Sequence, residues 1–239
     1  KVAENGEILV KSPGLLKEYY KNPAATAKAF DGGWFHTGDA VTKTERGELV
    51  FLERLSDLKR LAGGETFPPQ FVETRLRFSP FIKDIMTVGD ETRDFVAALI
   101  NIDMDVVSRW AEDKRIGFST FTDLSQKSEV AALLRQEIAR VNTFLPVHAR
   151  VRRFANFPKE LDPDEGELTR SRKLRREFLL ERYGALIEGL YNRAQEVQIE
   201  IPVTYQDGRR SQFKARVLIH DAQGHEGDRA DAKQARSRT

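Results

Sequence analysis

An almost unbroken apolar run, Phe95–Ile100, restricts the fold of this chain more than any other feature of its sequence. Charged residues lie on both sides of the run, which is typical of a short strand buried inside a sheet. A buried strand is stable only in a sheet that other elements cover. We therefore expect the chain from Arg54 to about Arg193 to form a small sheet with helices packed against it.

The helices that would cover such a sheet are indicated by regularly spaced apolar residues. Between Glu129 and Leu145 they recur every three or four positions, which predicts the clearest helix of the chain. Pro69 is well suited to the first turn of another helix, because its missing N–H needs no partner there. The remaining predictions are helices over residues 69–78, 104–113 and 174–190, and a strand over residues 151–157.

The first fifty residues are rich in glycine and in turns, and they favour strands. Glu7–Lys11 alternates as a strand does, and Leu15–Lys21 indicates a short amphipathic turn or helix. The pair Arg46-Gly47 separates two alternating segments, so we expect a hairpin there.

A second hairpin is expected near the C-terminus. Two alternating segments, Glu196–Tyr205 and Ser211–Ile219, are joined at Asp207-Gly208, a pair that favours tight hairpin turns. Pro202 cannot donate a ladder hydrogen bond, which predicts that the first strand lies at a sheet edge. Asp221–Thr239 is polar and charged, which is typical of disorder.

Composition excludes several classes of function. The chain has no cysteine, so disulfides, thiolate metal sites and cysteine nucleophiles are excluded. Lys and Arg number 39 against 37 Asp and Glu, a balance that gives no support to nucleic-acid binding. The histidines show no metal-ligand spacing, and no apolar run approaches the roughly 20 residues of a membrane span. A cytoplasmic location is expected, with peripheral membrane contact left open.

The segment Trp34–Asp39 reads Trp-Phe-His-Thr-Gly-Asp. It resembles the aromatic-x-x-Thr-Gly-Asp motif of the adenylate-forming superfamily, which includes acyl-CoA synthetases, adenylation domains and firefly-type luciferases. A Thr-Gly-Asp triplet alone would more often be an aspartate in a loop after a glycine turn. The surrounding segments 6–10, 12–14, 19–26 and 47–49 also resemble that family. The resemblance implies that Thr37 and Asp39 bind the nucleotide, with the two carboxylate oxygens of Asp39 accepting from both ribose hydroxyls.

The segment Glu53–Glu65, followed by Pro-x-x-Val-Glu at positions 69–73, is similar to the hinge segment of the same family. The resemblance implies that Arg54 binds the ribose and that Asp57 is the hinge about which a small C-terminal domain turns. It also implies that Gly63, Gly64 and Glu65 face the acyl-adenylate and CoA. In isolation, the segment would be read as a charged turn before an amphipathic helix.

The segment Gly166–Arg176 reads Gly-Glu-Leu-Thr-Arg-Ser-Arg-Lys-Leu-Arg-Arg. It looks like the Gly-x-Leu-Thr-Pro-Thr-x-Lys segment near the end of adenylate-forming enzymes, with Arg170 in place of the proline. The resemblance implies that Lys173 is the catalytic lysine of adenylation. A mobile ammonium can bridge a substrate carboxylate and the α-phosphate. The alternatives are a solvated basic helix start or a nucleic-acid patch, and no interleaved aromatic residues support the latter.

The family resemblance implies an α+β fold in four parts. Residues 1–56 would end a large adenylation domain, 57–193 would form a mobile C-terminal domain, 194–220 a β-hairpin extension and 221–239 a disordered tail. Segments 76–83, 88–90 and 97–100, and the helical insertion at 121–145, resemble the long-chain fatty acid–CoA ligase branch. The implied substrates are a fatty acid, ATP and CoA, with AMP as a product and Mg²⁺ as a cofactor.

Two motifs of the family are missing from the sequence: the Ser/Thr/Gly-rich phosphate loop and the segment with the glutamate that holds Mg²⁺. We therefore expect the chain to be a C-terminal fragment that is inactive alone and works with an N-terminal domain. Two alternatives remain open. One is an acyl-AMP ligase or adenylation domain that loads a carrier protein, and the other is a non-catalytic binding module.

Overall fold

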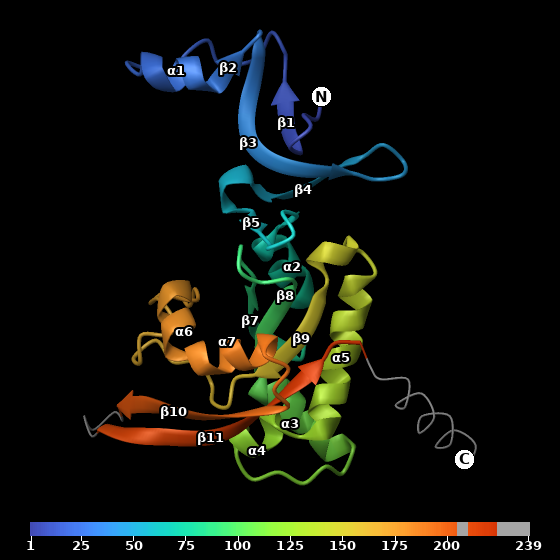
Figure 1. The fold of residues 1–239 in the computed structure, drawn as a ribbon, viewed down its shortest axis with the longest axis vertical. Coiled ribbons are helices and arrows are strands. Elements are labelled where there is room, and N and C mark those ends of the chain that lie inside the picture. The colour runs from blue at the N-terminus through green and yellow to red at the C-terminus, as the bar shows by residue number, and fades with distance from the viewer. Residues whose placement is uncertain (205–209, 224–239) are drawn as a thin grey trace. The chain divides into compact units, whose positions relative to one another are not determined.

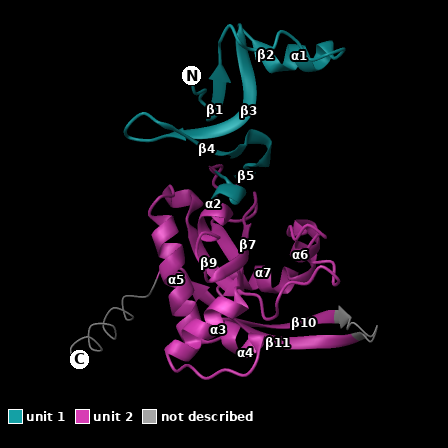
Figure 2. Ribbon diagram, turned by 180° about the vertical axis from the view of Figure 1, so that it is seen from behind, with its two compact units in different colours: residues 1–59, 67–71 teal, residues 60–66, 72–239 magenta. Residues whose placement is uncertain are grey.

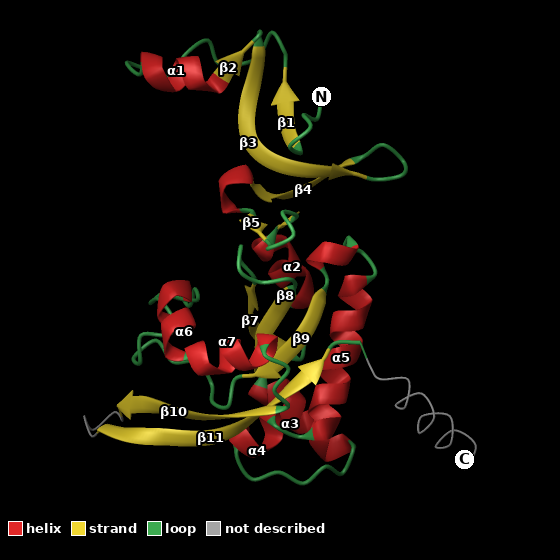
Figure 3. Cartoon of the chain, viewed as in Figure 1, coloured by secondary structure: helices red, strands yellow, loops and turns green. Residues whose placement is uncertain are grey.

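The computed structural model describes residues 1–204 and 210–223, which divide into two compact units (Figure 2). Unit 1 comprises residues 1–59 and 67–71, and unit 2 comprises residues 60–66 and those from 72 onward. Each unit combines strands with helices (Figure 3), so the predicted α+β class is confirmed.

Unit 1 is built around one long strand, β3, which pairs antiparallel with each of the other three strands in its sheet (Figure 1). The hairpin predicted at Arg46-Gly47 connects β3 to β4 and is confirmed. Gly47 has φ +85°, a left-handed conformation that glycine adopts without a Cβ clash. The strands are β1 (Glu7–Val10), β2 (Phe30–Asp31), β3 (Trp34–Lys43) and β4 (Leu49–Arg54).

In unit 1, α1 (Pro23–Ala29) begins where its sequence supplies a cap. The side chain of Asn22 accepts a hydrogen bond from the Ala25 N–H at 3.0 Å, and Pro23 occupies the first helical turn. The preceding segment, Leu15–Lys21, contains turns but no helix, so only the turn alternative of that prediction holds.

Unit 2 contains a five-stranded sheet in the order β10-β11-β9-β8-β7. Strands β8 and β9 are parallel, and the other neighbours are antiparallel. Every residue of β8 is buried, which confirms the buried strand predicted from the apolar run. The strands are β7 (Ile82–Val88), β8 (Val96–Ile102), β9 (Val151–Asn156), β10 (Glu196–Thr204) and β11 (Arg210–Asp221). The short strands β5 (Lys59–Arg60) and β6 (Thr66–Phe67) form a separate two-stranded sheet.

Several helices of unit 2 lie where the sequence predicts them. The longest, α5, buries Val130, Leu134 and Ile138 on one face, as the repeat requires. The α-helices of this unit are α2 (Pro69–Leu76, whose first turn belongs to unit 1), α3 (Met104–Asp113), α4 (Phe121–Ser125), α5 (Ser128–Asn142), α6 (Arg176–Arg182) and α7 (Gly184–Tyr191). Among the described residues, short 3₁₀ turns are formed by η1 (Leu55–Asp57) in unit 1 and η2 (Val147–Ala149) in unit 2.

The prediction of one helix over residues 174–190 is wrong, because the helix is interrupted at Tyr183. Tyr183 leaves the helical conformation with φ −106° and ψ 21°, and its side chain is buried. There its hydroxyl donates to a carboxylate oxygen of Glu167 at 2.9 Å. Gly184 follows and begins α7. A polar contact distant in sequence therefore accompanies the break in the helix.

The C-terminal hairpin is confirmed, and it extends the main sheet through the pairing of Ile219 with Ala155. Strand β10 lies at the sheet edge, as Pro202 predicts, while the turn predicted at Asp207-Gly208 lies outside the described residues. The expectation of disorder from Asp221 onward is wrong at its start, because Asp221 ends β11 and its carboxylate pairs with Arg153. Residues 224–239 lie outside the described part.

Candidate functional site

The Thr-Gly-Asp triplet lies inside β3 of unit 1, and not in a loop. The hydroxyl of Thr37 donates to the Ile8 carbonyl on β1 at 2.8 Å, and it accepts from the N–H of Asp39 at 3.1 Å. Gly38 between them has φ +71°, which few other residues adopt without strain. The motif is therefore a locally distorted strand whose shape the threonine hydroxyl stabilises.

Glu7, on the neighbouring strand β1, holds this distortion in place. Its buried carboxylate accepts from the Gly38 N–H at 2.9 Å and lies 2.9 Å from Nδ1 of His36. Burial alone would raise the pKa of Glu7, but the hydrogen bonds from His36 and Gly38 outweigh it and hold the pKa below its ordinary value. From the sequence, Glu7 is expected only as part of a strand and of a segment that resembles the family, because the residues it contacts lie about thirty positions away.

A prediction follows for Glu7→Gln. Since the folded pKa of Glu7 lies below 4.5, its carboxylate stabilises unit 1 fully above that pH, and the stabilisation is lost as the pH falls through the folded pKa. We expect the variant to lose less stability than the parent chain between about pH 6 and pH 3. The measurement is urea unfolding followed by Trp34 fluorescence in a Trp110→Phe background.

The control for that experiment is Glu48→Gln, which alters an exposed carboxylate beside the β3–β4 turn. It should follow the parent chain across the whole pH range. An equal loss of stability in the parent chain and in Glu7→Gln would contradict the assignment of the acid sensitivity to this carboxylate.

Asp39 and Arg54 are directly opposite each other on β3 and β4. The Arg54 Nη1 lies 2.8 Å from Oδ1 of Asp39 and also donates to the Thr37 carbonyl at 2.8 Å. The structure thus brings together Thr37, Asp39 and Arg54, the three residues expected to bind a nucleotide. Both charged side chains keep part of their surface exposed, so a ligand can reach them.

The predicted hinge residue, Asp57, is the last residue of η1 and is exposed. The Ser56 hydroxyl donates to its carboxylate at 3.1 Å. The division between the two units falls two residues later, after Lys59. No interaction of Asp57 with a residue distant in sequence is found in the described part of the chain.

The residues expected to face CoA form the tip of a hairpin loop between β5 and β6. The loop is closed by hydrogen bonds from the Leu61 N–H to the Glu65 carbonyl at 2.8 Å and from the Gly64 N–H to the Leu61 carbonyl at 2.9 Å. Gly64 has φ +89°, and a Cβ there would meet nothing within 4 Å. Gly63, Gly64 and Glu65 are all exposed, so their backbone is accessible to a ligand.

Lys173 lies on a short hairpin of unit 2, residues 168–174, which we call the lysine hairpin. Leu168 and Leu174 pair across its base, and the Thr169 N–H donates to the Lys173 carbonyl at 2.8 Å. The Lys173 N–H in turn donates to the Thr169 hydroxyl at 3.0 Å. Arg172 takes a left-handed conformation, φ 59°, to complete the turn. Lys173 is exposed, and these hydrogen bonds fix the backbone that carries it.

A buried ionic cluster holds the upstream end of the lysine hairpin. Glu167 is fully buried, and its carboxylate accepts from the Lys159 ammonium at 2.7 Å, the Tyr183 hydroxyl at 2.9 Å and the Asp162 N–H at 3.0 Å. The Arg182 Nε lies 3.3 Å away. Burial and the Glu167 carboxylate raise the pKa of Tyr183 far above its ordinary value, so this phenol stays protonated and donates.

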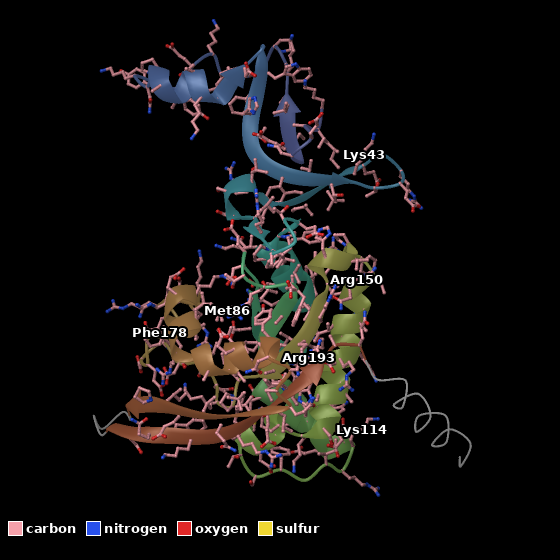
Figure 4. All side chains as sticks on the ribbon, viewed as in Figure 1. Lys43, Met86, Lys114, Arg150, Phe178 and Arg193 are labelled. Carbon is pink, nitrogen blue, oxygen red and sulfur yellow. The ribbon has the colours of Figure 1, made fainter. Side chains whose placement is uncertain are left out.

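A second carboxylate completes this cluster. Glu165 lies 3.2 Å from the Lys159 ammonium and 2.5 Å from Nη2 of Arg182, so two acidic and two basic groups share one site. The guanidinium groups of Arg182 and Arg175 lie 5.6 and 5.5 Å from the ring centre of Phe178, which is labelled in Figure 4. None of these contacts was predicted from the sequence.

The site residues therefore fall into three groups. Thr37, Asp39 and Arg54 share the sheet of unit 1, whereas Lys173 and the Gly63–Glu65 loop are on separate loops of unit 2. Within residues 1–204 and 210–223, no three histidine, aspartate or glutamate side chains are grouped so that they could hold a metal ion. In the same residues, no helix combines the length and the apolar character that crossing a membrane requires.

Comparison with known proteins gives a family match. Residues 57–195 match the family described as AMP-binding enzyme C-terminal domain. The match begins at the predicted hinge residue and ends just after α7, so it includes both the Gly63–Glu65 loop and the lysine hairpin.

Curated relatives extend the similarity across both units. Long-chain-fatty-acid–CoA ligase FadD15 of Mycobacterium tuberculosis is 30% identical over 194 residues, which cover 81% of this chain and 32% of the relative. Long-chain-fatty-acid–CoA ligase 1 of Cavia porcellus is 30% identical over 191 residues, covering 78% of this chain and 27% of the relative. The chain thus spans at most about a third of the length of these relatives.

One solved structure with a similar fold is the adenylation domain of a carboxylate reductase from Mycobacterium chelonae. It is 27% identical to this chain and superimposes with a TM-score of 0.51, covering 78% of this chain and 28% of that one. The similarity is therefore one of fold as well as of sequence.

Proposed function

Because the chain belongs to the family of AMP-binding enzyme C-terminal domains, we propose that it acts as the C-terminal part of an AMP-forming long-chain fatty acid–CoA ligase. The observation that carries this proposal is the lysine hairpin, which presents Lys173 to solvent within the matched domain. The similarity to two long-chain-fatty-acid–CoA ligases supports the substrate class, a long-chain fatty acid.

The proposed reaction has two steps. A fatty acid carboxylate oxygen attacks the α-phosphorus of ATP, a P–O bond forms and pyrophosphate leaves with the electrons of the bond that breaks. The CoA thiolate then attacks the acyl carbonyl, and AMP leaves. We assign Mg²⁺ and the site for the β- and γ-phosphates to the remainder of a complete ligase.

Each group of residues has a role in this proposal. Asp39 would accept from the ribose hydroxyls, with Arg54 and Thr37 shaping the same site. Lys173 would contact the carboxylate and the α-phosphate, where its positive charge stabilises negative charge that develops as pyrophosphate leaves. The backbone of Gly63–Glu65 would lie along CoA during thioester formation.

A direct assay tests the function. The complete protein that contains residues 1–239 is given ATP, Mg²⁺ and palmitate with and without CoA, and acyl-adenylate and palmitoyl-CoA are measured by mass spectrometry. We expect palmitoyl-CoA only when CoA is present. Acyl-adenylate that CoA does not consume would favour a ligase that loads a carrier protein, and the absence of both products would favour a non-catalytic binding module.

The two-step reaction needs two faces of one small domain, which predicts an effect for Asp57→Pro. Proline fixes the backbone where the domain is proposed to turn, so conversion of acyl-adenylate to acyl-CoA should slow several-fold while acyl-adenylate formation is less affected. The measurement is rapid-quench kinetics of both steps in the complete protein.

The matched control is Asp57→Ala, which removes the carboxylate but leaves the backbone free to turn. It should retain the overall turnover, because the hinge role depends on backbone rotation. Unchanged turnover in Asp57→Pro would argue against the hinge assignment.

We further propose that the complete protein works in the cytoplasm, free or in contact with the surface of a membrane.

A further inference from the structure

Glu73, on α2, is a buried carboxylate with three donors around it. It is 9% exposed, and one of its oxygens accepts from the N–H of Thr87 at 2.7 Å and from the Thr87 hydroxyl at 2.6 Å. The guanidinium of Arg176 donates to the same oxygen. Burying an ionised carboxylate costs free energy unless hydrogen-bond donors or an opposite charge replace the lost water, and these three donors do so.

Arg176 uses its second nitrogen as well. Its Nη1 donates to the Thr87 carbonyl at 3.0 Å, so one guanidinium joins a helix carboxylate and a strand carbonyl. Three elements of unit 2 therefore meet here: α2 through Glu73, β7 through Thr87 and the first residue of α6 through Arg176.

The position of Arg176 gives this contact its significance. Arg176 is three residues after Lys173 and two residues beyond the downstream end of the lysine hairpin. The upstream end is held by the Glu167 cluster, and the Arg175 N–H donates to the Glu167 carbonyl at 3.0 Å. The hairpin is thus attached to the body of unit 2 on both sides, and Glu73 supplies the attachment on the downstream side.

We propose that Glu73 and Arg176 are positioning residues that fix the lysine hairpin, and with it Lys173, on unit 2. Neither would touch a substrate. The effect of this positioning on catalysis rests on the function proposed above, whereas the attachment of the hairpin to unit 2 does not. Glu73 lies on α2, the helix that follows the Gly63–Glu65 loop, and Arg176 begins α6, the helix that follows the lysine hairpin. The Glu73–Arg176 ion pair therefore connects the helices that follow the two functional loops.

The first test measures the hairpin itself. Hydrogen exchange of the 239-residue chain is compared with that of Arg176→Met, which retains the length of the side chain but loses both charged hydrogen bonds. We expect exchange in residues 168–175 to become about tenfold faster, with that in β8 and β9 unchanged. Glu177→Gln alters the exposed neighbour on α6 and should exchange as the parent does.

The second test measures catalysis in the complete protein. A lysine displaced by about 1 Å can cost about 10²-fold in rate, so Arg176→Met and Glu73→Gln should lower kcat for acyl-adenylate formation with little change in KM for ATP. Thioester formation from supplied acyl-adenylate should persist. Arg176→Lys, which keeps the charge, should recover part of the rate.

The outcomes separate the two proposals. Unchanged exchange in the hairpin of Arg176→Met overturns the positioning role. Equal losses in both half-reactions, together with faster exchange throughout unit 2, also overturn it, because they indicate general destabilisation. A complete parent protein that forms no acyl-adenylate refutes the proposed function, while the exchange experiment still decides whether this ion pair fixes the hairpin.

Discussion

Replacing Lys173 with alanine in the complete protein is expected to slow acyl-adenylate formation by about 10²- to 10³-fold. The lysine is exposed on a hairpin whose backbone is fixed by Thr169, so the variant should lose the ammonium without disturbing the turn. The measurement is single-turnover formation of acyl-adenylate from ATP and palmitate, followed by chemical quench.

The size of this effect follows from the charge that develops when pyrophosphate leaves. A fixed cation at the reacting oxygens stabilises that charge in the transition state more than in the ground state, so its loss appears in the rate of the step. Thioester formation from supplied acyl-adenylate should be nearly unaffected, because pyrophosphate has already departed.

Arg170→Ala is the matched control, because it removes an exposed cation of the same hairpin at a position with no assigned role. It should retain most of the adenylation rate. If Arg170→Ala and Lys173→Ala lose rate equally, the effect belongs to the charge of the whole basic segment. Equal loss in both half-reactions of Lys173→Ala would remove the specific role in adenylation.

The second large effect concerns stability. Glu167→Ala should lower the free energy of unfolding of unit 2 by about 3 kcal/mol. The variant leaves Lys159 and Arg182 with a single carboxylate, Glu165, and leaves the Tyr183 hydroxyl and the Asp162 N–H without their buried acceptor. Uncompensated charges and unpaired donors in an interior both destabilise.

Urea unfolding of the 239-residue chain measures this effect when Trp34→Phe leaves Trp110 of unit 2 as the fluorescent probe. Glu181→Ala is a suitable control, since it removes an exposed carboxylate from α6, and a change within about 0.5 kcal/mol is expected. A similar small change in Glu167→Ala would show that Glu165 alone can neutralise the two cations.

Local signals predicted the elements of the fold well. The helix α3 spans the expected residues because Asp103 accepts from the Val106 N–H and caps it, and the period of α5 required no knowledge of its neighbours. Pro202 predicted an edge strand because proline has no N–H to donate to a neighbouring strand, a property that depends on this residue alone. The Asn-Pro pair that begins α1 was a usable signal that the sequence interpretation did not apply.

Contacts between distant residues were not predictable from such signals. Glu73 and Arg176 are 103 positions apart, and nothing in either surrounding segment indicates the other. The break at Tyr183 coincides with a hydrogen bond to Glu167, and the distorted Thr-Gly-Asp strand is contacted by Glu7. Resemblance to a family identified the residues expected to meet a substrate, whereas the residues that hold them became visible only in the structure.

The parallel pairing of β8 with β9 has a consequence for how unit 2 folds. The two strands are separated in the sequence by α3, α4 and α5, so they cannot pair until this whole segment has closed into a loop. Loop closure over such a distance costs chain entropy before any pairing compensates for it, and it slows folding. The β10–β11 hairpin is local, but it joins the sheet only through β9. Assembly of the sheet on a growing chain is therefore a late event, and the apolar run of β8 is exposed to other chains until then.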